Sequence, residues 1–134
     1  MHTTNYTNAF IEVAEDCAVE GAVMPPHRDN KTVARRQFEM IYEHPYAYTS
    51  DDVLFTVYAD RNGLADEELT RARSEFFAKG QACLRASPLA KTYGWGFHFD
   101  ADSKVALVAL GSEQYERLVT DGSLRHLRAM KRSR

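Results

Sequence analysis

The chain has 134 residues, of which 44% are hydrophobic and 27% are charged, and its formal net charge is -2. This length suits one domain with one core, and this composition excludes an intrinsically disordered chain and a miniprotein that depends on disulfides. The charge is unevenly distributed, because the last ten residues carry five lysines or arginines and no acid, whereas all 19 acids precede them.

The first predicted elements are a strand, a loop and a helix. Residues 9–14, AFIEVA, alternate apolar and polar side chains and include β-branched ones, which is typical of a half-buried strand. A loop is expected over about residues 15–31, which contain the pair Pro25-Pro26. The following run, TVARRQFEMIYEH, repeats apolar side chains at helical spacing, and Pro45 ends this helix because proline cannot donate the next backbone hydrogen bond.

The segment TSDDVLFTVYADRNGL, residues 49–64, fits two structures. Alternate positions from Val53 to Ala59 would form one face of a strand. Ser50 as a cap, the two acids that follow it and Asn62-Gly63 as a stop are instead typical of a helix. We predict a helix over 51–62 and keep the strand as the alternative.

The remaining elements alternate helices and strands. The run ADEELTRARSEFFAKG predicts a helix that ends at Gly80, Ser87 and Pro88 start one short helical turn, and SEQYERLV predicts a later helix capped by Ser112. Strands are expected at GWGFHF, KVALVAL and LRHLRAM. This order predicts a single α+β domain with an antiparallel or mixed sheet of about four strands, helices packed on one face, and a basic tail at about 130–134.

The stretch QACLRASPLAKTYGWGFHFD, residues 81–100, contains the candidate binding residues. Arg85 and Lys91 flank the turn at Ser87, where two cations and backbone amides can hold an anion. Tyr93 and Trp95 offer flat faces to a ring or a cation. We therefore expect a site for a small anionic or aromatic ligand, formed by Arg85, Ser87, Lys91, Tyr93, Trp95 and His98.

A structural role explains the same residues without a ligand. Arg85 would then pair with one of the acids, and Trp95 would anchor the core. Gly94 and Gly96 suit that interpretation, since a strand glycine lets a neighbouring backbone or a large ring approach closely.

Two other classes of function are kept as alternatives. A cysteine-dependent enzyme would use Cys83 as the nucleophile and His98 as its base, but the sequence favours a module without catalysis. An interaction protein would act through the basic tail or as a homodimer. The acidic body argues against nucleic acid as the partner of that tail.

Several features are missing from the sequence. The five histidines and two cysteines have no metal-binding spacing, and no phosphate-loop or dinucleotide motif occurs, so neither a metal nor a cofactor is expected. No apolar stretch is long enough for a membrane span, and the first residues lack the pattern of a signal peptide. We expect a cytoplasmic protein in which Cys17 and Cys83 are reduced.

Four stretches carry a resemblance: MHTTNYTNAFIEVAEDC, YTSDDVLFTVYADRNG, CLRASPLAKTYGWGFHFD and KVALVAL. With them the chain resembles a family of small bacterial proteins that is known only as a domain of unknown function. The resemblance covers nearly the whole chain, including the ending AMKRSR. It implies a single-domain bacterial protein and supplies no activity, ligand or catalytic residue.

Overall fold

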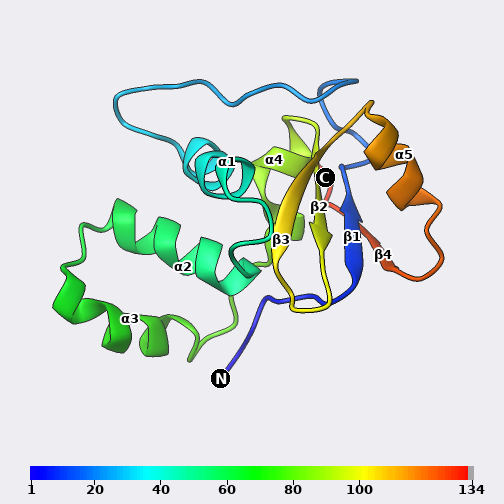
Figure 1. Ribbon diagram of the computed structural model, residues 1–134. Helices are drawn as coiled ribbons and strands as arrows, with labels where there is room; N and C mark the ends of the chain where they lie inside the picture. Colours follow the sequence, from blue (N-terminus) through cyan, green and yellow to red (C-terminus); the bar gives the residue numbers. More distant parts are fainter. Residues whose placement is uncertain (133–134) are drawn as a thin grey trace.

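A four-stranded mixed sheet forms the centre of the fold in the computed structural model, which describes residues 1–132 (Figure 1). The strand order is β3-β2-β1-β4, with β1 antiparallel to β2, β2 antiparallel to β3, and β1 parallel to β4. The strands are β1 (Ala9–Glu12), β2 (Trp95–Phe99), β3 (Val105–Ala109) and β4 (Arg125–Arg128). The sheet and the helices around it confirm the predicted α+β class.

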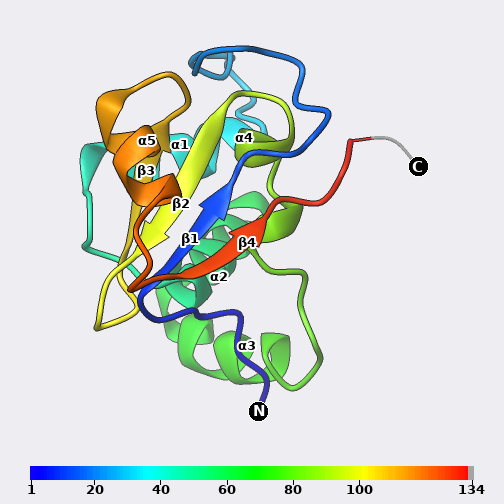
Figure 2. The ribbon, with the colours of Figure 1, turned by 90° about the vertical axis from the view of Figure 1, so that its right-hand side faces the viewer.

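The helices lie on both sides of this sheet. They are α1 (Val33–Glu43), α2 (Ser50–Arg61), α3 (Leu69–Phe76), α4 (Pro88–Lys91) and α5 (Glu113–Val119), with short 3-10 turns at Asp66–Glu68 and Leu84–Ala86. Helices α1 and α4 pack on one face, α2 packs beside α1, and α3 lies farther out beside α2 (Figure 1). Helix α5 contacts β1 and β3 from the opposite face, which is the side nearest the viewer in Figure 2.

The position of α5 differs from the prediction that helices pack on one face only, because this helix covers the opposite face of the sheet. Alternation along β1 and β3 places the large side chains of Phe10 and Val108 on the face away from α1. Tyr115 of α5 packs edge-on against Phe10, with ring centroids 5.1 Å apart, and its hydroxyl accepts a hydrogen bond from the Val13 backbone N–H at 3.0 Å. A second small core therefore forms there, because these apolar side chains would otherwise face water.

The ambiguous segment 49–64 forms helix α2, so the helix prediction is confirmed. The cap is Thr49 rather than Ser50: its hydroxyl accepts from the Asp52 N–H at 3.1 Å, and the Asp52 carboxylate accepts from the Thr49 N–H at 3.0 Å. The strand-like pattern arises because α2 is buried on two sides. Val53 enters the main core against the sheet, whereas Phe55 joins a separate cluster with residues of the α3 segment.

Residues 13–32 contain no helix or strand, in agreement with the expected loop, but hydrogen bonds fix the loop at several points. The Val23 N–H donates to the Tyr93 carbonyl at 2.9 Å, and the indole N–H of Trp95 donates to the Val23 carbonyl at 2.8 Å. The chain after β4 runs beside the start of this loop and in the same direction (Figure 2). Residues 133–134 of the predicted basic tail lie outside the described residues. Within residues 1–132, no helix combines the length and the apolar character needed to cross a membrane.

Candidate functional site

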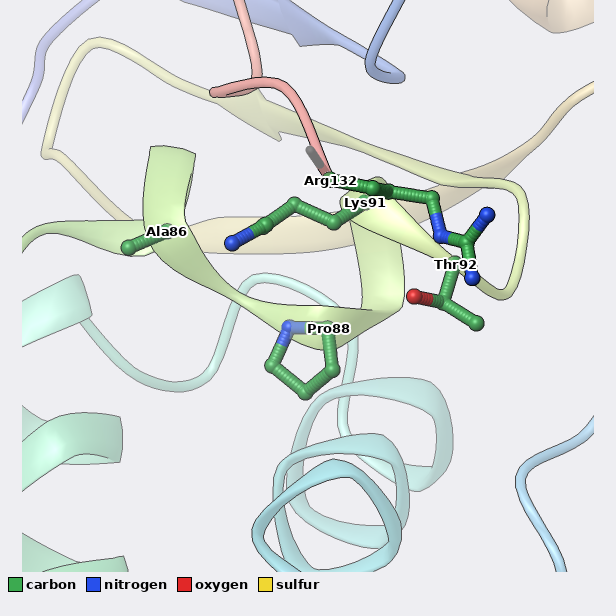
Figure 3. A pocket seen from close by; sticks show the side chains of 5 residues that line it. All are labelled: Ala86, Pro88, Lys91, Thr92 and Arg132. Carbon is green, nitrogen blue, oxygen red and sulfur yellow. The ribbon is translucent and has the colours of Figure 1, made fainter. Parts of the chain in front are cut away.

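A cavity of about 380 Å³ opens at the end of α4, beside the chain that follows β4 (Figure 3). Its lining residues are Ala86, Pro88, Lys91, Thr92 and Arg132. The Lys91 side chain extends toward Ala86, whereas the Arg132 side chain extends in the opposite direction and ends beside Thr92 (Figure 3). Two cations that are 41 positions apart in the sequence thus line one cavity.

The local sequence explains how Lys91 reaches the cavity. Ser87 caps α4, since its hydroxyl oxygen accepts from the Leu89 N–H at 3.1 Å, and Pro88 occupies the first helical position, where its missing N–H is not needed. The helix ends after one turn at Lys91. Gly94, with φ +80°, then turns the chain into β2, a conformation that residues with a side chain rarely adopt.

Backbone hydrogen bonds bring Arg132 to the same place. The Ala129 N–H donates to the Glu12 carbonyl, and the Met130 N–H donates to the Arg85 carbonyl, both at 2.8 Å. The Arg132 N–H then donates to the Asp16 carboxylate at 2.8 Å. These contacts use the backbone of the segment, so the Arg132 side chain stays available for other contacts.

The residues that line the cavity carry a net positive charge. It is lined by two cationic residues and no acid, and neither Lys91 nor Arg132 forms an ion pair with a carboxylate of residues 1–132. Neighbouring cations are paired: Lys131 lies 3.6 Å from Glu15, and Arg128 and Glu12 form another pair. An anion that entered the cavity would therefore meet two unpaired cations and the Thr92 hydroxyl.

The structure gives two other predicted site residues mainly structural contacts. Arg85 does not line the cavity, and its Nε donates to the Arg128 carbonyl at 2.7 Å, which joins the Leu84–Ala86 turn to β4. Ser87 is buried and donates its hydroxyl proton to Oε1 of Gln37 at 2.6 Å. The hydroxyl thus donates to Gln37 of α1 and accepts at the cap of α4. Ser87 therefore fixes the position of α4, whose residues line the cavity, and does not itself face a ligand.

The predicted aromatic residues belong to the core. Trp95 is only 8% exposed, and its ring lies 5.4 Å from that of Phe38 and 5.6 Å from that of Tyr42, both on α1. Tyr93 is half-buried against the same core and accepts the backbone hydrogen bond of the loop described above. Neither residue lines the cavity at the end of α4. This arrangement matches the structural interpretation of the glycine-flanked tryptophan.

His98 lies on the other side of the sheet. It alternates with Phe97 and Phe99, which face α1, and its Nδ1 is hydrogen-bonded to the Tyr46 hydroxyl at 2.7 Å. Burial lowers the pKa of His98 below its ordinary value, and the charges of Asp100 and Asp121 oppose that shift. His98 is thus separated from Lys91 by the sheet.

Cys83 and His98 are not brought together either. The Cys83 thiol lies 3.3 Å from the Tyr6 hydroxyl, and the Tyr6 ring packs on Phe99 with centroids 5.5 Å apart. Because Phe99 and His98 point to opposite faces of β2, the sheet lies between the thiol and the imidazole. No group of three or more His, Cys, Asp or Glu side chains suited to a metal ion occurs within residues 1–132.

Sequence reasoning missed Thr92 and Arg132. The signal for Arg132 was the basic tail itself, but the sequence did not indicate which surface the tail would contact. Nothing in the sequence distinguishes Thr92 from any other threonine, so the sequence did not indicate that this residue lines a cavity.

Comparison with known proteins yields one family. The family with the description "Family of unknown function (DUF6157)" matches residues 1–134. No curated protein and no solved structure matches the chain. The match covers both segments that form the cavity at the end of α4, and the inference of function rests on the geometry of that cavity.

Proposed function

The chain belongs to this family of unknown function, and we propose that it is a binding protein for a small anionic ligand held between Lys91 and Arg132. One observation carries the proposal: two cations from separate segments line one cavity with no acid and no ion-pair partner among residues 1–132. Like charges around one cavity repel each other, and an anion between them replaces that repulsion with attraction.

The cavity also limits the kind of anion. A volume of about 380 Å³ falls within the range of about 300 to 1,000 Å³ of small-molecule sites. The guanidinium of Arg132 can donate two parallel hydrogen bonds to a carboxylate or a phosphate, and Lys91 adds a point charge. Ala86 and Pro88 supply an apolar wall for the rest of the ligand. A phosphate or carboxylate group on a small organic body fits these features.

We propose that the protein binds this ligand without catalysing a reaction. The candidate nucleophile Cys83 and the candidate base His98 lie on opposite sides of the sheet, so the alternative of a cysteine-dependent enzyme gains no support. A bacterial source and a cytoplasmic location stay predictions. The second of these agrees with the free thiols of Cys17 and Cys83, which suit a reducing compartment.

Calorimetric titration with two anions tests the proposal. Pyrophosphate represents phosphate ligands and citrate represents carboxylate ligands, and saturable binding of at least one of them is expected at low ionic strength. Lys91→Gln and Arg132→Gln should each weaken that binding about tenfold, the size expected for losing a charge-assisted hydrogen bond. The anion that binds more tightly identifies the ligand class.

The matched control is Lys79→Gln, which removes one exposed positive charge beyond the end of α3. This variant should bind as the unchanged protein does. Equal weakening by Lys79→Gln would show that only net charge attracts the anion, and the absence of saturable binding to both anions would also overturn the proposal.

A further inference from the structure

A second cavity, of about 210 Å³, lies between α1 and α2 and is closed on a third side by the end of α3. Its walls are mainly apolar and include Val33 of α1, Leu54 and Val57 of α2, and Phe76 of α3. Tyr58 also lines the cavity. This residue is 41% exposed, and the centroid of its ring lies 4.8 Å from that of Phe76. No residue of this cavity lines the cavity that contains Lys91 and Arg132.

Gln37 places a hydrogen-bond donor at this cavity. Only 3% of this residue is exposed, and its Oε1 accepts the hydroxyl proton of Ser87 at 2.6 Å, which fixes the orientation of the amide. The amide Nε2 donates to no partner among residues 1–132, although Gln37 lines the cavity. Among residues 1–132 the fully enclosed side-chain nitrogen or oxygen without a partner is Arg36 Nε, so Gln37 Nε2 is still open to the cavity and can donate to an acceptor atom of a ligand there.

Arg61 adds a positive charge to the same cavity. It is the last residue of α2, lines the cavity, and forms no ion pair with a carboxylate of residues 1–132. Its charge at this helix end also suits the helix dipole, which alone does not require a ligand. The lining contains no acid, so Arg61 and the Gln37 amide together favour an acceptor that carries negative charge.

We infer that this cavity is a binding site for a small apolar molecule bearing one carboxylate, such as a monocyclic aromatic acid. The apolar walls take the ring, the Gln37 amide donates to the carboxylate, and Arg61 balances its charge. A volume of about 210 Å³ lies below the usual range for drug-sized ligands, which limits the occupant to about one ring. The site is independent of the anion-binding function proposed above.

Nuclear magnetic resonance titration of the ¹⁵N-labelled chain tests this inference with benzoate and its neutral analogue benzyl alcohol. Benzoate should shift the side-chain NH₂ signals of Gln37 in a saturable way and bind more tightly than benzyl alcohol. Arg61→Gln should remove most of that preference, a change of about threefold, the size of an exposed ion pair. Arg117→Gln removes another exposed positive charge, from α5 on the other face of the sheet, and should leave the preference unchanged.

A blocking variant tests the location without disturbing the core. Ala82 lines the cavity from an exposed position, so Ala82→Trp should fill the cavity and abolish benzoate binding while the chain stays folded. Benzoate shifts that do not saturate, that leave the Gln37 side chain unaffected, or that persist in Ala82→Trp would overturn the inference. Pyrophosphate binding is measured on the same variant and should be unchanged, which separates this result from a failure of the anion site.

Discussion

The buried hydrogen bond between Ser87 and Gln37 allows a sharp test of the role assigned to Ser87. The hydroxyl of Ser87 donates to Gln37 Oε1 at 2.6 Å and accepts from the Leu89 N–H at 3.1 Å, and the serine is 4% exposed. Ser87→Ala removes the cap of α4, which costs about 1 kcal/mol, and leaves the Gln37 oxygen buried without a donor, which costs about 1 to 3 kcal/mol more. We expect the free energy of unfolding to fall by about 2 to 4 kcal/mol.

A double-mutant cycle isolates the hydrogen bond from the cap. Gln37→Met keeps the length and volume of the side chain but removes both polar atoms. In the background of Gln37→Met, Ser87→Ala should cost only the cap, because no oxygen of residue 37 is then left unpaired. The sum of the two single effects should therefore exceed the double effect by about 1 to 3 kcal/mol, which lies within the range of coupling energies for residues in contact.

Urea unfolding followed by the fluorescence of Trp95 measures each variant. Trp95 is the only tryptophan of the chain and is largely buried, so unfolding changes its surroundings strongly. Additive single effects, within about 0.5 kcal/mol, would refute the reasoning. Such a result would mean that the Ser87 hydroxyl is not held by Gln37 and is free to contact a ligand.

Three further predictions concern single residues. Tyr115→Phe should lower the free energy of unfolding by about 1 to 3 kcal/mol, because the buried Val13 N–H loses its acceptor, and it should also remove a loss of stability above pH 10, since burial raises the pKa of Tyr115 to about 12. Gly94→Ala should cost at least about 1 kcal/mol in urea unfolding, because φ is +80° and the new Cβ would lie 2.9 Å from Val19 Cγ2. Burial lowers the pKa of His98 below 6.5, so its contribution to stability is complete above pH 6.5 and lost as pH falls; thermal melts of His98→Asn should lack this loss.

Much of the fold was predictable because local signals agreed with the final packing. Caps, stops and periodicity predict the helices, and the acids and the Asn62-Gly63 stop that favoured a helix in the ambiguous segment do lie at the two ends of α2, although its cap is Thr49, one residue before the predicted Ser50. The neighbours in the sheet were not predictable in the same way. Strand β4 pairs in parallel with β1, although more than a hundred residues separate them, and no short motif of the sequence encodes that pairing.

The site was predicted less well than the fold. Lys91 lines a cavity, whereas Trp95 and Ser87 are needed by the core, and the single-residue alternation of β2 turns His98 to the other face. Sequence proximity in the stretch 81–100 therefore did not mean spatial proximity. Arg132, the second cation of the cavity, comes from a segment whose position depends on backbone contacts to β1 and to the Leu84–Ala86 turn.

The contacts of this segment also explain where the acidic part and the basic end of the chain meet. Acids at the start of the loop meet the basic tail: Glu15 pairs with Lys131, and the Asp16 carboxylate accepts from the Arg132 N–H. An exposed ion pair such as that of Glu15 and Lys131 contributes at most about 1 kcal/mol and is screened by salt, so it does not by itself hold the segment in place. The backbone hydrogen bonds from Ala129 and Met130 do not depend on charge. Salt should therefore weaken an anion's attraction to the Lys91 and Arg132 side chains without releasing the segment that carries Arg132.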